Sequence, residues 1–167
     1  MDKYPGNVFG VAGFKNTGKT TLIECLIAEF SKRKINVATL KHTHHDLDFS
    51  GSGTDSERHR RAGAAETIVC SPTETQHVKT YLKEQPNLQT LLRQLGAYDI
   101  ALAEGWKQEP LQKLMVCDAV DAPPFPGTIA YVVATDTAKQ ASLPVFHRDN
   151  VTEIATFLLA KCAADQS

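Results

Sequence analysis

From residue 13 to residue 20 the chain reads Gly13-Phe14-Lys15-Asn16-Thr17-Gly18-Lys19-Thr20, which has the pattern Gly-x-x-x-x-Gly-Lys-Thr. The apolar run 8–12 precedes it and has the length of a short buried strand. After it, Leu22, Cys25, Leu26 and Phe30 recur at helical spacing, which predicts a helix over about residues 19–33. The pattern therefore joins a strand to a helix, and this context makes the motif specific.

A loop of this composition is suited to hold a chain of phosphate groups. Gly13 and Gly18 allow the main chain to approach the phosphates, and the helix that begins at Lys19 directs the positive end of its dipole at the same place. The Lys19 ammonium neutralises the outer phosphates, and the Thr20 hydroxyl is placed to bind Mg²⁺. We therefore predict a P-loop that binds a nucleoside triphosphate. The predicted contacts in and after the loop are Gly13, Asn16, Thr17, Gly18, Lys19, Thr20 and Thr21.

The other apolar segments alternate between strand and helix patterns. Strands are predicted at 37–40, 66–70, 100–103, 114–116 and 129–134. Helices are predicted from the capping box Thr54-Asp55-Ser56-Glu57 to Gly63, over 88–95, and over 151–163. Such alternation predicts an α/β fold: a mostly parallel twisted sheet with helices on both faces, the three-layer α/β/α arrangement of P-loop NTPases.

Composition limits the class of protein. With 167 residues, 42% of them hydrophobic and 22% charged, the chain fits one domain over residues 1–167. A net charge of -1 gives no basic footprint for nucleic acid. The four cysteines are widely spaced within apolar runs, which predicts buried free thiols. The N-terminus has neither a signal peptide nor a membrane span, so we expect a cytoplasmic protein with no membrane partner.

Two carboxylates flank the predicted strand 100–103, and one of them is the candidate for the metal. Asp99 begins the strand and Glu104 ends it, so they lie roughly 16 Å apart at about 3.3 Å per residue. Ligands of parallel sheets bind at the carboxyl ends of the strands. We therefore predict that Glu104 joins Thr20 in a Mg²⁺ site and that Asp99 is a cap or surface residue.

Two polar segments follow the strand 37–40, and each allows more than one interpretation. The first segment is Lys41-His42-Thr43-His44-His45-Asp46-Leu47-Asp48. Its side chains suit a site for a transition metal, a sensor of the γ-phosphate, or a site for the anionic group of a second substrate, and the alternative is a polar loop without a fixed ligand. Arg58 and Arg61 share a helix face. They suit a phosphate clamp, or a solvated face that Asp55 and Glu57 partly neutralise.

A base contact is predicted where the strand 129–134 ends in Thr135-Asp136. An aspartate there accepts hydrogen bonds from the N1-H and the 2-amino group of guanine, each worth about 1.5–3 kcal/mol. Adenine lacks this pair of donors, so the residue favours GTP. A turn or helix cap at Asp136 is the alternative.

Four stretches together resemble the molybdopterin-guanine dinucleotide biosynthesis protein B family, MobB. They are the P-loop at 13–20, the segment from Lys41-His42 to Asp48, the segment from Gly53-Thr54-Asp55 to Gly63-Ala64, and Glu104-Gly105-Trp106-Lys107. Ala134-Thr135-Asp136 is similar to the family's proposed guanine-contacting segment. The loop residues Lys15-Asn16-Thr17 depart from the small, serine- and glycine-rich loop of the family.

The resemblance implies a GTP-binding protein with slow Mg²⁺-dependent hydrolysis, usually a homodimer. It implies that the protein assists a MobA-like molybdopterin guanylyltransferase, the enzyme that joins GMP to molybdopterin. By the same resemblance Lys19 and Thr20 hold phosphates and Mg²⁺, Glu104 belongs to a second metal-binding motif, and His42 to Asp48 with Asp55 to Arg61 line the adjacent surface.

Two other functions remain open from the sequence. A nickel-delivery GTPase would carry the metal on His44, His45 and Asp48. A small-molecule kinase would clamp its acceptor with Arg58 and Arg61, although the sequence offers no evident base to activate that acceptor. No residue is assigned to orient an attacking water, so slow hydrolysis is predicted in the absence of a partner.

Overall fold

A computed structural model describes residues 4–43, 54–81, 84–120, 123–135 and 141–164. The chain divides into two compact units, one made of Met1–Thr43 with Leu88–Ser167 and the other of His44–Asn87. That residues 1–167 form one domain stays a prediction.

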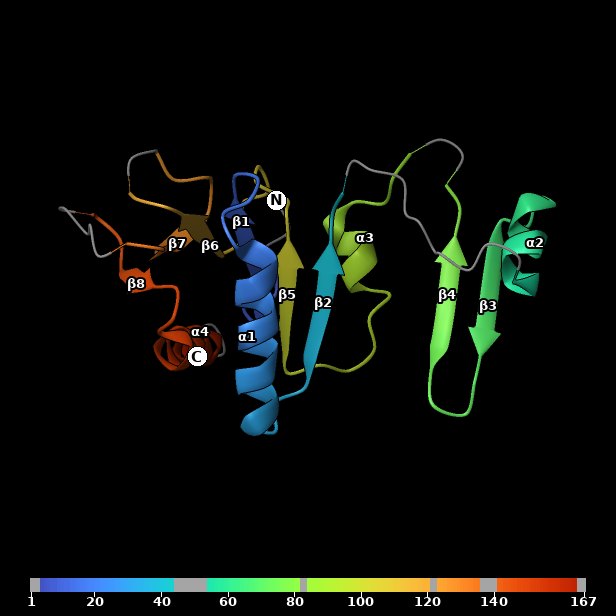
Figure 1. The fold of residues 1–167 in the computed structure, drawn as a ribbon, viewed down its shortest axis with the longest axis horizontal. Coiled ribbons are helices and arrows are strands. Elements are labelled where there is room, and N and C mark those ends of the chain that lie inside the picture. Colours follow the sequence, from blue (N-terminus) through green and yellow to red (C-terminus); the bar gives the residue numbers. More distant parts are fainter. Residues whose placement is uncertain (1–3, 44–53, 82–83, 121–122, 136–140, 165–167) are drawn as a thin grey trace. The chain divides into compact units, whose positions relative to one another are not determined.

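The first unit is built on a six-stranded sheet in the order β2-β5-β1-β6-β7-β8, in which every neighbouring pair is parallel (Figure 1). The strands are β1 (Val8–Gly13), β2 (Val37–Lys41), β5 (Ile100–Glu104), β6 (Lys113–Cys117), β7 (Thr128–Val133) and β8 (Val145–His147). Their registers align Glu104 with both Val11 and Lys41. The carboxyl ends of the three strands therefore meet at one edge of the sheet.

Alternating side chains of the strands build a core on each face. Helices α1 (Lys19–Lys32) and α4 (Val151–Ala164) pack together over one face, where Phe9 and Leu26 are fully buried. On the other face, Val8 packs with the short helix α3 (Leu88–Leu92), and loop residues cover β6 and β7. Figure 1 shows α1 in front of the sheet and α3 behind it. The predicted α/β fold with helices on both faces is confirmed.

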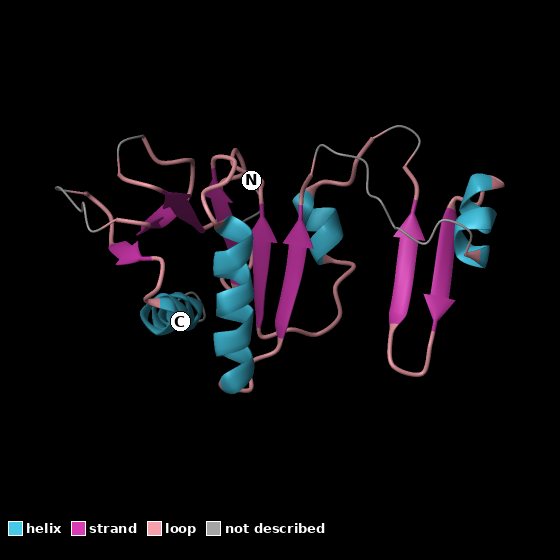
Figure 2. Cartoon of the chain, in the orientation of Figure 1, coloured by secondary structure: helices cyan, strands magenta, loops and turns pink. Residues whose placement is uncertain are grey.

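The second unit consists of helix α2 (Asp55–Arg61) and the antiparallel strands β3 (Glu66–Cys70) and β4 (Thr75–Lys79), shown by type in Figure 2. The Thr54 hydroxyl accepts a hydrogen bond from the Glu57 N-H, which confirms the predicted helix start. The strand predicted at 66–70 does not belong to the parallel sheet. It pairs with β4 across a tight turn, and the Ser71 hydroxyl accepts from the Glu74 N-H in that turn.

Three further sequence predictions need correction. Helix α3 ends at Leu92 instead of continuing to 95, because the following N-H groups form tighter turns such as Leu95 N-H to the Leu92 carbonyl. Strand β8 was missed, since three residues are too few to show a period. Of the four cysteines only Cys117 is buried, because an apolar run on a helix such as α1 also has a solvent face.

In the described part of the chain no helix has the length and apolar character that a membrane crossing requires.

Candidate functional site: the loop between β1 and α1

The loop between β1 and α1 has a conformation that depends on glycine at both ends. A Cβ added at Gly13 would lie 2.2 Å from the Val116 carbonyl oxygen, so no side chain fits there. Gly18 is the N-cap of α1 and has a φ of 85°, which favours glycine. Between them Asn16 has a φ of 64°, a conformation that asparagine tolerates better than most residues. The loop therefore turns sharply and delivers the chain into the N-terminus of α1, whose first N-H groups have no intrahelical acceptor.

Lys19 lies over this loop. Its Nζ donates to the Phe14 carbonyl at 2.6 Å, and the Thr17 hydroxyl donates to the same oxygen at 3.0 Å. Burial lowers the pKa of Lys19, with smaller contributions from the charges of Lys107 and Lys41, while the Glu104 carboxylate opposes the shift. A cation that is partly desolvated and repelled by two others gains from an anionic ligand.

The structure places Glu104 directly beside Thr20. The Thr20 hydroxyl donates to the two carboxylate oxygens at 3.3 and 3.4 Å, and the Lys41 Nζ lies 3.3 Å from one of them. A hydroxyl and a carboxylate are hard oxygen ligands of the kind that Mg²⁺ prefers. These residues fit the predicted metal site, in which Thr20 and Glu104 would hold the ion. Asp99 accepts a hydrogen bond from the Asn36 N-H at the opposite end of β5, as expected for a cap.

The segment after Glu104 is held by a lysine that the sequence analysis missed. Lys113 is fully buried, and its Nζ donates to the main-chain carbonyls of Trp106 at 3.1 Å, Lys107 at 2.9 Å and Glu109 at 2.5 Å. Burial lowers its pKa to about 8. The only signal in the sequence is a lysine at the start of an apolar strand. Its contacts fix the path of the chain immediately beyond Glu104.

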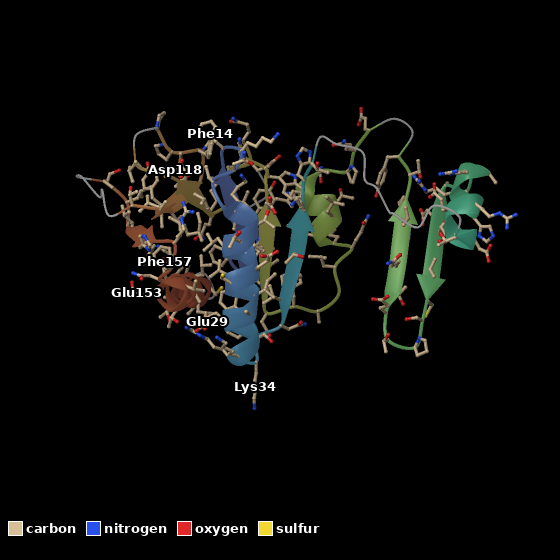
Figure 3. All side chains as sticks on the ribbon, in the orientation of Figure 1. Phe14, Glu29, Lys34, Asp118, Glu153 and Phe157 are labelled. Carbon is tan, nitrogen blue, oxygen red and sulfur yellow. The ribbon has the colours of Figure 1, made fainter. Side chains whose placement is uncertain are left out.

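A second group that the sequence did not reveal stands at the outer side of the loop. The Phe14 ring is 55% exposed, and its centroid lies 5.9 Å from that of Phe125. The Lys107 Nζ lies 5.0 Å from the Phe14 centroid and 5.6 Å from that of Phe125. Figure 3 labels Phe14 at the carboxyl edge of the sheet and Lys34 at the far end of α1. Lys107 is therefore a third lysine at this edge, and its charge, like that of Lys41, acts on Lys19.

Some of the other predicted residues also lie at this edge. The His42 N-H donates to the Glu104 carbonyl at 3.0 Å, and the His42 ring lies against Trp106 at 5.4 Å. Thr135 is the second residue after β7, and its hydroxyl donates to the Asp118 carbonyl. Thr17, Gly18 and Thr21 border a common cavity.

The remaining predicted residues belong to the second unit or lie outside the described residues. Arg58 and Arg61 belong to the second unit, where they pair with Asp55 at 3.5 Å and Glu57 at 2.8 Å. These pairs match the solvated-face interpretation, and a role in binding stays a prediction. Asp48, Asp136, His44 and His45 lie outside the described residues. The nickel alternative depends on the histidines of that group and therefore stays a hypothesis.

A parallel sheet in this strand order, with a glycine-bounded loop between its first strand and an α-helix, defines an α/β protein of the P-loop NTPase type. Residues 8–136 match the family model described as MobB, Molybdopterin guanine dinucleotide synthesis protein B. The chain belongs to this family.

Similar proteins support the same assignment. The chain is 32% identical over 155 residues to the molybdopterin-guanine dinucleotide biosynthesis adapter protein of Haemophilus influenzae, covering 90% of this chain and 86% of that protein. It is 39% identical over 108 residues to the Escherichia coli protein of the same name, covering 63% of this chain and 62% of that protein. The crystal structure of Bacillus subtilis MobB superposes with a TM-score of 0.76 at 28% identity, covering 95% of this chain and 98% of that chain.

Proposed function

We propose that this chain is a GTP-binding adapter with weak Mg²⁺-dependent GTPase activity, which assists the attachment of GMP to molybdopterin. The family and the names of its relatives support the adapter role in molybdopterin guanine dinucleotide synthesis. The proposal that the chain binds a nucleotide rests on the geometry of the loop between β1 and α1. A glycine-bounded turn, a desolvated lysine and the Thr20–Glu104 pair meet at the carboxyl edge of the sheet, which is where parallel sheets bind ligands.

The proposed partners follow from the same role. The adapter acts in the cytoplasm as a homodimer on a MobA-like molybdopterin guanylyltransferase, with molybdopterin itself as a further candidate ligand. Turnover is slow without that partner, because the Glu104 carboxylate already accepts from Thr20 and pairs with Lys41, so it serves a metal instead of activating water.

Nucleotide competition tests the base preference. With Mg²⁺ present, GTP is expected to bind the protein more tightly than ATP, and Asp136→Ala is expected to reduce the preference by about tenfold or more, the worth of a hydrogen bond to a charged acceptor. Isothermal titration calorimetry of both nucleotides measures this. Equal affinities for GTP and ATP in the parent protein would refute the GTP assignment, whatever Asp136→Ala does.

Glu104→Gln tests the metal site. The amide keeps the shape of the side chain but loses the charge that would face Mg²⁺, so we expect Mg²⁺ to enhance GTP affinity strongly in the parent and weakly in the variant. The thermal midpoint should fall only modestly. The Glu104 side chain is 14% exposed, but the Lys41 end of the lost ion pair is 59% exposed, and pairs open to solvent contribute about 1 kcal/mol or less.

Asp99→Asn is the matched control for Glu104→Gln. It alters the carboxylate at the opposite end of β5, which contacts the Asn36 N-H. This variant should keep the full effect of Mg²⁺ on GTP affinity even if its stability falls. An unchanged Mg²⁺ effect in Glu104→Gln would remove Glu104 from the metal site.

A further inference from the structure

A cavity of about 290 Å³ opens on the flank of the loop, between α1, the end of β6 and the connection from β8 to α4. Thr17, Gly18 and Thr21 form its wall on the loop side. Val116 and Val151 contribute apolar surface, and Arg148 supplies a positive charge beside the largely exposed carboxylate of Asp149. A cavity that is apolar on one side and offers a guanidinium donor beside a phosphate-binding loop suits a flat organic group with hydrogen-bond acceptors.

Arg148 is the unexplained residue of this cavity. Its Nε is buried and has no hydrogen-bond partner among the described residues. Its one ion pair joins NH2 to Asp118 at 3.6 Å, and the Asp118 side chain is 81% exposed. A buried donor without an acceptor costs about 1–3 kcal/mol, so an arginine held in this way needs a reason.

The main chain and the loop both hold Arg148 in place. Its N-H donates to the Val133 carbonyl at 2.8 Å, which fixes it at the carboxyl end of β7. Its NH1 lies 3.4 Å from the position that a Cβ at Gly18 would occupy. The guanidinium therefore lies against the loop at the N-cap of α1, a position from which it reaches a ligand that leaves the loop toward the cavity.

We propose that this cavity binds the nucleoside end of the nucleotide and that Arg148 donates to an acceptor there. The inference rests on the proposed function, since the loop must hold the phosphates. The acceptor lies on the ribose or on the base. An arginine fork matches the O6 and N7 acceptors of guanine, whereas adenine presents an amino donor in place of O6.

Cysteine protection tests where the nucleoside lies. Cys25 borders the cavity and is exposed, while Cys70 is exposed in the other unit. Both thiols of the unmodified protein are alkylated with iodoacetamide, and the two rates are followed by peptide mass spectrometry. Saturating Mg²⁺-GTP is expected to slow alkylation of Cys25 and leave Cys70 unchanged, and Mg²⁺-tripolyphosphate is expected to leave both unchanged. A Cys25 rate that saturating GTP does not alter, or that tripolyphosphate slows equally, would overturn the proposal.

Arg148→Gln tests the contact. Arg93→Gln is the control, because Arg93 is exposed and its guanidinium donates to the Thr90 hydroxyl of α3. Calorimetry is expected to show that Arg148→Gln lowers the affinity for GTP and for GDP by about tenfold or more, which corresponds to the loss of one charge-assisted hydrogen bond. Tripolyphosphate should bind as in the parent, and Arg93→Gln should match the parent throughout. A greater loss for GTP than for ATP places the contact on the base, and an equal loss places it on the ribose.

The outcomes separate this inference from the proposed function. A parent protein that binds neither GTP nor tripolyphosphate would contradict both the proposed function and this inference. If the parent binds GTP and the Arg148→Gln variant binds it with equal affinity, only the proposed contact of Arg148 is contradicted. A variant that loses tripolyphosphate as strongly as GTP also contradicts it, because Arg148 would then act on the phosphate chain and not on the nucleoside end.

Discussion

Lys19→Ala is expected to weaken Mg²⁺-GTP binding by about 100-fold or more, because the ammonium would make at least two charge-assisted bonds of about 1.5–3 kcal/mol each to the phosphates. In the free protein Lys19 donates to the Phe14 carbonyl, in an exposed contact. Its removal should therefore cost little stability. Calorimetry measures the affinity, and thermal unfolding checks that the variant stays folded.

Lys15→Ala is the matched control for this experiment. Lys15 lies in the same loop and is exposed, and it is not among the residues predicted to contact the phosphates. Its removal should change GTP affinity only slightly, through the loss of a screened surface charge. If Lys19→Ala bound GTP as tightly as Lys15→Ala, the loop between β1 and α1 would lose its assignment as the phosphate site.

Lys113→Met is expected to lower the free energy of unfolding by about 2 kcal/mol or more. It removes a donor from three partly buried carbonyls, of which, among the described residues, only that of Trp106 also accepts from the Glu109 N-H, and a buried carbonyl without a donor costs about 1–3 kcal/mol. The affected carbonyls belong to Trp106, Lys107 and Glu109. Since these contacts hold the chain after Glu104, the variant should also weaken the effect of Mg²⁺ on GTP affinity. Urea unfolding measures the stability.

The pH dependence of the same variant gives a second test. Burial lowers the pKa of Lys113 from its ordinary value of 10.5 to about 8. Between these pH values the unfolded chain binds more protons at this position than the folded chain, so the stability contributed by Lys113 rises with pH. The stability difference between the parent and Lys113→Met should therefore grow from pH 7.5 toward about pH 9.5, and other titrating groups cancel in that difference.

Lys32→Met supplies the control. Lys32 is a lysine at the end of α1 whose side chain is 77% exposed and forms one long ion pair of 3.9 Å with Glu29. Surface pairs of this kind contribute about 1 kcal/mol or less. Equal unfolding midpoints for Lys113→Met and Lys32→Met would show that the buried ammonium does not hold the loop.

The sequence by itself determined the features that depend on local pattern and chain direction. The Gly13 to Thr20 loop, the strand before it and the helix after it follow from spacing and glycine conformation, and α1 and β1 begin where predicted. The choice of Glu104 over Asp99 also needed no coordinates, because all strands of a parallel sheet present their carboxyl ends at one edge. The structure accordingly places Glu104 beside Thr20.

Tertiary structure alone decided which distant side chains meet at that edge. The pairing of Lys113 with the carbonyls beyond Glu104, the contact of Lys107 with Phe14 and Phe125, and the position of Arg148 against Gly18 join separate segments of the chain. The hairpin of β3 and β4 likewise depends on pairing partners. Periodicity records which side of an element is apolar, whereas strand order and packing decide what that side contacts, and these are properties of the whole chain.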